Sequence, residues 1–201
     1  MVKNFLFFLQ RCPLLLRMKG GDSVDQVTKW IREIQKRGSR QAADQLIRTY
    51  YDEIYRFVCR QTGDKETAMD LTQDIFLAVL GALAGFDGRK ATFRTWLYRI
   101  AANKVIDARR RVRRDVLPLE ETEPIAPEDF AAQVQDRLLL EQIEAYISAL
   151  DPQVQGVFRL RVYGEKTFSE IAAALDQPEA AVKARYYRLM GRLRKEFSTD
   201  G

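Results

Sequence analysis

Residues 167–197 read TFSEIAAALDQPEAAVKARYYRLMGRLRKEF, and this stretch contains two helical patterns separated by a short turn. Thr167 and Glu170 form a T-x-x-E capping box, which predicts the start of a short helix. The turn follows at Asp176, and Pro178 suits the start of the next helix because its missing N–H would have no partner there. A short helix, a tight turn and a longer helix are typical of a helix-turn-helix.

The second helix of this stretch has one apolar face and one basic face. Its apolar residues recur every three or four positions and predict a stripe toward the core: Val182, Tyr186, Leu189, Leu193 and Phe197. The remaining face and its flanks carry Lys183, Ala184, Arg185, Tyr187, Arg188 and Arg192. Because the second helix of a helix-turn-helix fits the major groove, we predict that this face contacts duplex DNA. The alternative is a solvated basic face on an ordinary helical hairpin.

Charge is unevenly distributed over the 201 residues, although 33 Lys and Arg against 28 Asp and Glu give a net charge of only +5. Bases cluster at 109–114 and at 183–195, whereas residues 115–129 hold six acids and no base. This distribution predicts two surfaces for a polyanion. The chain has no histidine, and Cys12 and Cys59 lie far apart, so we predict no disulfide framework, metal site, cofactor or catalytic residue. The apolar neighbours of Cys59 favour a buried, inert thiol.

Apolar periodicity predicts an all-α protein made of two small helical domains, with no strand of useful length. The first domain is predicted at 24–114 and the second at 131–201. Between them, residues 115–130 hold three prolines and the acidic run, which is typical of a flexible linker. The helices are expected at about 24–37, 39–62, 64–85, 93–114, 131–150, 152–164, 168–175 and 178–197. Ser39 can cap the second of these helices, and Asp64 or Thr67 opens the third. The residues expected on the inside of the third helix are Met69, Leu71, Ile75, Phe76, Val79, Leu80 and Leu83.

The first 23 residues form an extension in front of the first predicted helix. Its apolar run is short and is interrupted by Gln10, Arg11 and Pro13, so we predict neither export nor membrane insertion. Codons for Met18 to Asp22 could contain a ribosome-binding sequence, with Val24 as a GTG start just downstream. One hypothesis is therefore that residues 1–23 do not belong to the natural product.

A different surface is predicted in FRTWLYRIAANKVIDARRRVRR, residues 93–114. Trp96, Ile100, Asn103 and Asp107 share one helical line, and the bases beside it are Arg99, Lys104, Arg110 and Arg111. An aromatic ring and an amide next to bases suit single-stranded DNA, whose unpaired bases stack on rings and expose hydrogen-bonding edges. The alternative is that Phe93, Trp96 and Ile100 are core residues and that Asp107 pairs with Arg110 or Arg111.

Two segments together resemble a known family. Residues 70–76, DLTQDIF, and residues 93–110, FRTWLYRIAANKVIDARR, closely resemble the second conserved region of extracytoplasmic-function sigma factors, group IV of the sigma-70 family of bacterial RNA polymerase. Residues 167–194 resemble the fourth region of the same family, and the resemblance covers about residues 24–197.

The resemblance implies an RNA polymerase sigma factor, which directs core polymerase to promoters and opens the strands. The helix with Asp70, Gln73 and Asp74 would dock on the clamp coiled coil of the polymerase. The loop with Asp87, Gly88, Arg89 and Lys90 would pocket a flipped base of the minus-ten element, and Trp96, Asn103, Lys104, Asp107, Arg110 and Arg111 would lie along that strand. Lys183, Ala184, Tyr187 and Arg188 would read the minus-thirty-five element.

The resemblance further implies a cytoplasmic protein with three kinds of partner: core polymerase at its clamp and flap, promoter DNA, and an anti-sigma factor. The acidic linker would thread the polymerase channel. Where relatives usually have glycine at the turn, this chain has Asp176, which is expected to adopt the same left-handed backbone.

Two other functions remain open from the residues alone. One is a conventional helix-turn-helix regulator that binds a palindrome as a dimer. The other is a metal-dependent nuclease that uses Asp70 and Asp74, which share a helix face. Two carboxylates alone, however, provide few of the ligands that a metal ion needs.

Overall fold

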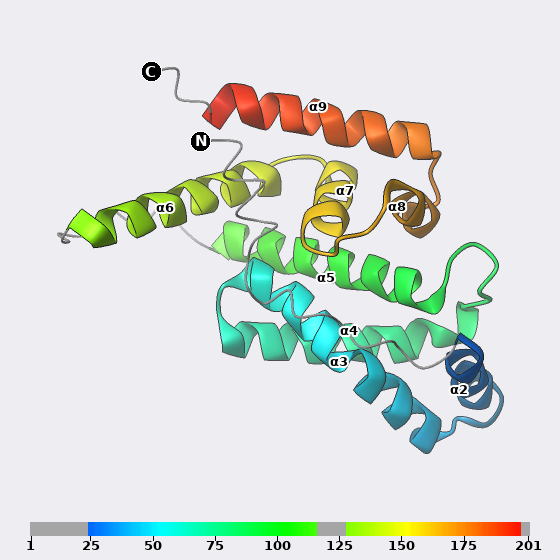
Figure 1. Ribbon diagram of the computed structural model, residues 1–201. Helices are drawn as coiled ribbons and strands as arrows, with labels where there is room; N and C mark the ends of the chain where they lie inside the picture. The colour runs from blue at the N-terminus through cyan, green and yellow to red at the C-terminus, as the bar shows by residue number, and fades with distance from the viewer. Residues whose placement is uncertain (1–23, 116–127, 198–201) are drawn as a thin grey trace.

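The computed structural model describes residues 24–115 and 128–197, and all regular structure within these two ranges is helical (Figure 1). The predicted all-α fold is therefore confirmed. The proposed extension at 1–23, most of the acidic linker and the last four residues lie outside the described residues. The elements are α2 (Val24–Arg37), α3 (Arg40–Thr62), α4 (Lys65–Ala82), η1 (Leu83–Gly85), α5 (Phe93–Asp115), α6 (Glu128–Ser148), α7 (Pro152–Val162), α8 (Phe168–Leu175) and α9 (Glu179–Phe197).

The helices of the first bundle, α2 to α5, begin and end at local signals in the sequence. The Ser39 hydroxyl accepts a hydrogen bond of 3.2 Å from the Ala42 amide at the start of α3. Gly63 ends α3 in a left-handed conformation with φ of 70°, and Asp64 then caps α4 by accepting from the Thr67 amide at 2.7 Å. The break after Gly85 separates α4 from α5 as predicted.

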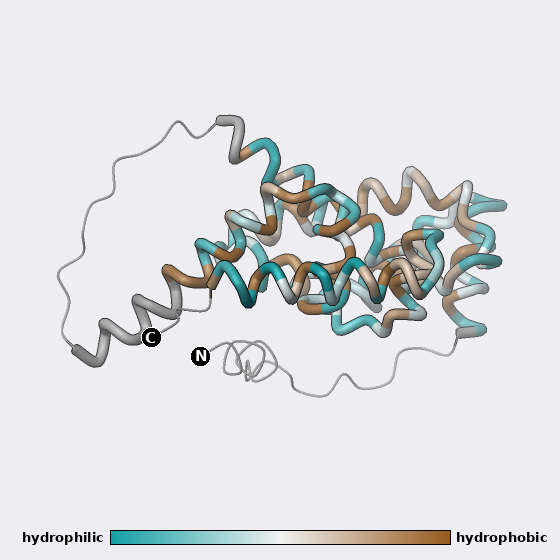
Figure 2. Tube along the Cα trace, turned by 90° about the horizontal axis from the view of Figure 1, so that it is seen from above, coloured by the Kyte–Doolittle hydropathy of each residue, from teal (hydrophilic) through white to brown (hydrophobic). Residues whose placement is uncertain are grey.

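The core of the first bundle comes from one face of each helix. Apolar residues recur along the helices in Figure 2, as amphipathic segments require. Ile54, Phe57, Ile75 and Leu97 are almost completely buried where α3, α4 and α5 meet. The long helix α5 therefore has one buried face, and its other face carries residues that are exposed to solvent.

The second bundle, α6 to α9, is closed by a smaller apolar cluster. Asp151 caps α7 by accepting from the Gln153 amide at 2.8 Å, and Pro152 occupies the first turn. Its core is formed by five buried residues from α6, α7 and α9: Ile143, Ile147, Phe158, Leu189 and Leu193. This cluster packs α9 against α7 and leaves the opposite face of α9 exposed to solvent.

The two bundles lie directly against each other. Both α7 and α8 pack on α5, with α9 beyond them (Figure 1). Val157, Leu160 and Ile171 of the second bundle belong to the same buried apolar cluster as Leu97 and Tyr98 of the first. The sequence predicted two bundles but did not predict this shared core.

Two sequence predictions about burial were wrong. Met69 was assigned to the inside of its helix, but its side chain is 47% exposed because it lies on the outer line of α4. Cys59 was expected to be buried, and it is only half-buried at the edge of the core.

The segment Lys65–Gly85 is long and apolar enough to cross a membrane by length and composition. In the structure this segment packs against α3 and α5, and it buries Leu71, Ile75, Phe76 and Val79. A helix that lies in the core of a bundle meets the same criteria, and α4 contributes to such a core in this structure.

The close approach at Gly164 predicts a steric defect. A Cβ atom there would lie 2.9 Å from the Leu160 carbonyl oxygen and 3.2 Å from the Tyr98 ring, so Gly164→Ala should destabilise the protein by about 1–3 kcal/mol. Gly156→Ala is the matched control, because its nearest neighbour would be a Leu175 methyl at 3.8 Å and alanine favours the helix by about 1 kcal/mol. Thermal unfolding followed by circular dichroism should give a lower midpoint for Gly164→Ala alone. Equal midpoints for the two variants would contradict the packing at this contact.

Candidate nucleic-acid interface

The helix-turn-helix begins with a complete capping box. The Thr167 hydroxyl accepts from the Glu170 amide at 3.2 Å, and the Glu170 carboxylate accepts from the Thr167 amide at 2.8 Å. Although partial burial opposes its charge, these hydrogen bonds, with Lys166 nearby, lower the pKa of Glu170. Asp176 ends α8 with φ of 54°, which confirms its predicted left-handed conformation. The turn therefore fixes the angle at which α9 leaves α8.

The basic face of α9 points to solvent. Lys183, Ala184, Tyr187 and Arg188 are exposed, and the Tyr187 side chain is 63% exposed beside the Phe168 ring. On this face the Lys183 ammonium pairs with Glu179 at 2.7 Å, and Arg188 donates to the Ala184 carbonyl at 3.2 Å. Exposed contacts of this kind contribute little to stability.

The two flanking arginines differ. Arg192 is exposed and continues the basic face. Arg185 is half-buried and donates to the side chain of Gln177, which lies in the turn between α8 and α9. In this structure Arg185 therefore stabilises the turn and is not part of the exposed basic face.

The loop before α5 is a compact turn. Gly88 has φ of 72°, and the Asp87 carboxylate accepts from the Arg89 amide at 2.9 Å, as in an Asx turn. The Lys90 ammonium reaches across to Asp176 in the turn of the helix-turn-helix, at 2.7 Å. This exposed pair lowers the pKa of Asp176, chiefly through the hydrogen bond from Lys90.

The outer face of α5 combines an aromatic anchor with polar groups. Trp96 is half-buried, with its ring centroid 5.0 Å from that of Phe86 and 5.8 Å from that of Phe93. Phe93 is a core residue, as the alternative interpretation held, and Ile100 is half-buried. Beyond Trp96 the predicted residues continue along the helix, with Asn103, Asp107, Arg110 and Arg111 exposed and Lys104 half-buried. The structure thus places these residues along one face of α5.

The helix α4 presents a separate surface of acidic and apolar residues. Asp70, Gln73 and Asp74 are exposed, which a docking face and a solvated acidic face both require. Met69 and Leu77 flank them, with exposed fractions of 47% and 68%. Neither residue was predicted from the sequence to be a functional candidate. Their spacing of four residues around Gln73 is the signal that could have found them.

The comparisons with known proteins match both parts of the chain. Residues 46–115 match the family model described as Sigma-70 region 2, and residues 140–193 match the one described as Sigma-70, region 4. The chain is 31% identical over 166 residues to the RNA polymerase sigma factor YlaC of Bacillus subtilis, with 79% of this chain and 94% of that relative covered. The chain belongs to the sigma-70 family.

Other relatives agree with this assignment. This sigma factor is 28% identical over 184 residues to the ECF RNA polymerase sigma factor SigW of Bacillus subtilis, covering 85% of this chain and 96% of that relative. Its fold resembles that of CnrH, solved in complex with the cytosolic domain of CnrY, with a TM-score of 0.54 and 22% identity over 89% of this chain and 98% of that chain. The protein is an RNA polymerase sigma factor of the extracytoplasmic-function type, which directs core polymerase to promoters.

Proposed function

We propose that this sigma factor belongs to group IV and divides promoter recognition between its two bundles. In this proposal residues 24–114 dock on core polymerase and hold the opened minus-ten strand, residues 115–130 link the bundles, and residues 131–201 bind the minus-thirty-five duplex. The observation that carries the proposal is the pair of exposed faces on α5 and α9, one with an aromatic anchor and polar groups and the other basic. Unpaired bases need rings and hydrogen-bonding edges, whereas a duplex groove accepts a basic helix.

For the minus-thirty-five element, α9 would enter the major groove with Lys183, Tyr187 and Arg188 outward. Arginine and lysine donate to guanine edges or to phosphates, and Ala184 would meet a thymine methyl. Arg185 and Arg192 would act from the flanks, and Arg185 would first have to exchange its contact with Gln177.

For the minus-ten element, the loop with Asp87, Gly88, Arg89 and Lys90 would receive a flipped base, and the exposed face of α5 would guide the strand. The rings of Phe86 and Phe93 support the Trp96 indole from behind, which fits a platform that must not move when a base stacks on it. Flipping a base costs a few kcal/mol, so the rigid frame of core polymerase is needed to hold both elements in register.

Core polymerase would bind α4 through its clamp coiled coil and the second bundle through its flap. The α4 face has carboxylates for basic partners at Asp70 and Asp74, and exposed apolar contacts at Met69 and Leu77. Apolar side chains surrounded by polar groups are the usual anatomy of a protein interface.

We further propose that the chain is a cytoplasmic initiation factor without enzymatic activity and that an anti-sigma factor controls it. The solved complex of CnrH with the cytosolic domain of CnrY supports the idea of a protein partner. In the described ranges, no three His, Cys, Asp or Glu side chains gather as a metal site, so Asp70 and Asp74 have no third ligand there for nuclease chemistry.

Arg188→Ala should weaken promoter binding by the holoenzyme by about 1–3 kcal/mol, because the exposed guanidinium would contact the minus-thirty-five duplex. Binding would be measured by fluorescence anisotropy, with duplexes that carry or lack this element. Arg32→Ala, which removes an exposed arginine from α2, is the matched control and should bind as the unmodified protein does. Equal binding by Arg188→Ala and Arg32→Ala would contradict the assignment of Arg188 to the minus-thirty-five duplex.

Trp96→Ala should impair strand opening while leaving duplex binding intact, because only unpaired bases stack on the indole. Opening would be followed by 2-aminopurine fluorescence at the minus-ten position, and a premelted template should restore much of the lost transcription. A defect in duplex binding, with opening unaffected, would contradict the role of Trp96.

Asp74→Lys should weaken binding to core polymerase by tenfold or more, as expected for about 1.4 kcal/mol or more lost at an interface charge. Asp44→Lys reverses an exposed carboxylate on α3 outside the proposed docking face and should bind normally. Surface plasmon resonance with immobilised core polymerase provides the measurement. If both variants bind alike, α4 is not the docking helix.

A further inference from the structure

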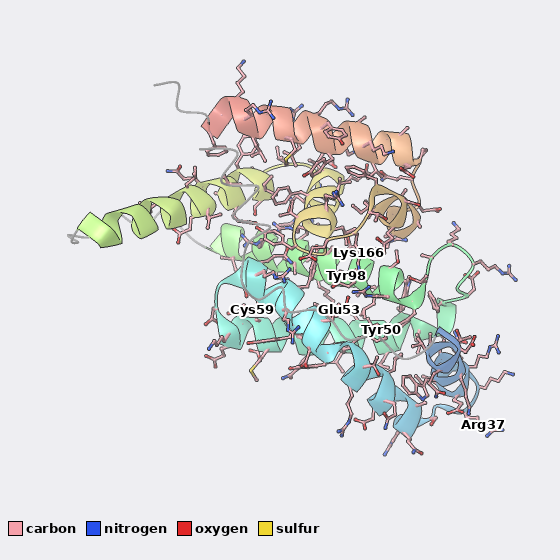
Figure 3. The ribbon with its side chains drawn as sticks, viewed as in Figure 1. Arg37, Tyr50, Glu53, Cys59, Tyr98 and Lys166 are labelled. Carbon is pink, nitrogen blue, oxygen red and sulfur yellow. The ribbon has the colours of Figure 1, made fainter. Side chains whose placement is uncertain are left out.

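The helix α2 ends beside the segment that leads into α5. Val27 and Ile31 on its inner face are buried in the core of the first bundle, and Ile34 packs against the same core. In Figure 3, α2, whose last residue Arg37 is labelled, lies next to η1. Because core packing fixes α2, a side chain that reaches from α2 to η1 has a rigid base.

Gln35, the neighbour of Ile34, extends its amide from α2 to the backbone at the end of η1. Its Nε2 atom donates to the Leu83 carbonyl oxygen at 2.9 Å and to the Phe86 carbonyl oxygen at 2.8 Å. Both partners are acceptors, so only the nitrogen of the amide fits between them, and its two hydrogens serve one carbonyl each. The chain leaves the helix at Phe86, whose φ of −82° and ψ of 121° are extended. The two hydrogen bonds therefore hold both sides of this bend.

Phe86 contacts both parts of the proposed minus-ten site. Its ring centroid is 5.0 Å from that of Trp96 and 5.8 Å from that of Phe93. The same ring is close to Gly88 of the loop, where an added Cβ atom would lie 3.8 Å from it. A shift of the Phe86 backbone would therefore disturb the loop and the Trp96 indole together.

The two ends of the loop are held in different ways. At its exit the Thr92 hydroxyl accepts from the Thr95 amide at 3.2 Å, as a helix N-cap does at the start of α5. Its entry is held from a distance, because Gln35 precedes Phe86 by 51 positions in the chain. Between these supports, residues 87–90 are exposed. The loop is thus anchored at both ends and open to a ligand in the middle.

We propose that Gln35 is a positioning residue of the minus-ten site. It holds the Phe86 backbone, and Phe86 in turn keeps the loop and the Trp96 indole in the arrangement that receives a flipped base. Flipping a base is costly, and a site that is already ordered adds no further cost of ordering. Gln35 itself does not touch the base. This inference rests on the proposed function, because it concerns how the proposed minus-ten site is held in place.

The test measures the affinity of the intact holoenzyme for a single-stranded oligonucleotide, the opened minus-ten strand of a promoter that the holoenzyme transcribes. Each base of the element is replaced in turn by an abasic site, and binding is followed by fluorescence anisotropy. The unmodified protein should lose affinity at the position whose base is flipped. A single strand is used because an abasic site in a duplex would also change the cost of opening.

Gln35→Met keeps the length of the side chain and removes its donor. It should lower the affinity for the intact strand by about fivefold, as expected for two hydrogen bonds of modest net strength. On the strand that is abasic at the flipped position, the same substitution should change the affinity by less than about twofold, because the site then has no base to hold. A general structural defect would lower both affinities equally.

Two further variants complete the test. Gln35→Lys retains a donor that can reach both carbonyls and should bind the intact strand more tightly than Gln35→Met does. Gln41→Met changes another exposed glutamine, on α3, and should bind both strands as the unmodified protein does. Circular dichroism would verify that all variants keep their helices.

Failure of the inference and failure of the proposed function give different results. If the unmodified holoenzyme binds the intact strand and every abasic strand equally, no base is held and the proposed minus-ten site is wrong. If it distinguishes these strands, but Gln35→Met binds the intact strand normally or loses the same factor on both strands, only the role of Gln35 is overturned.

Discussion

The buried guanidinium of Arg159 is the contact on which the arrangement of the two bundles depends. It is completely shielded from solvent and bridges Gln61 of one bundle and Glu144 of the other. A charged group in such a place is costly unless both partners stay in position, so the interface must form as a unit or not at all. The position of α7 against α3 therefore reflects a polar constraint as well as apolar packing.

The helix α5 serves two roles because its faces differ. One face, with Leu97, Tyr98 and Val105, is buried against both bundles, and the other carries Asn103 and Asp107 to solvent. Division of one helix in this way places the proposed strand-binding surface on a rigid element. The helix α9 repeats the arrangement in the second bundle, where a buried stripe holds the helix and leaves the basic face free to enter a groove.

Much of this fold could be predicted from the sequence because its signals are local. A hydroxyl before an apolar run predicted the caps at Ser39 and Thr167, Asp64 is the one of two candidates that caps α4, and Asp176 adopts the expected left-handed backbone. The basic face of α9 could be predicted because its stripe is long and regular. The contact between the bundles could not, because the burial of Lys166 depends on residues more than sixty positions away in the sequence, at Tyr98 and Glu53. The exposure of Met69 was missed because Ala68 and Leu71 beside it are buried, and periodicity over a few residues does not identify the face of Met69.

The central claim of the proposed function is that the two bundles divide promoter recognition, with the exposed face of α5 for the opened strand and the basic face of α9 for the duplex. Its most direct measurement is site-specific photocross-linking in the promoter-bound holoenzyme, with a photoreactive side chain at Asn103 on α5 or at Ala184 on α9, two exposed positions. The account predicts that position 103 cross-links to the opened strand of the minus-ten element and position 184 to the minus-thirty-five duplex. Cross-links from each position to the other element would contradict it.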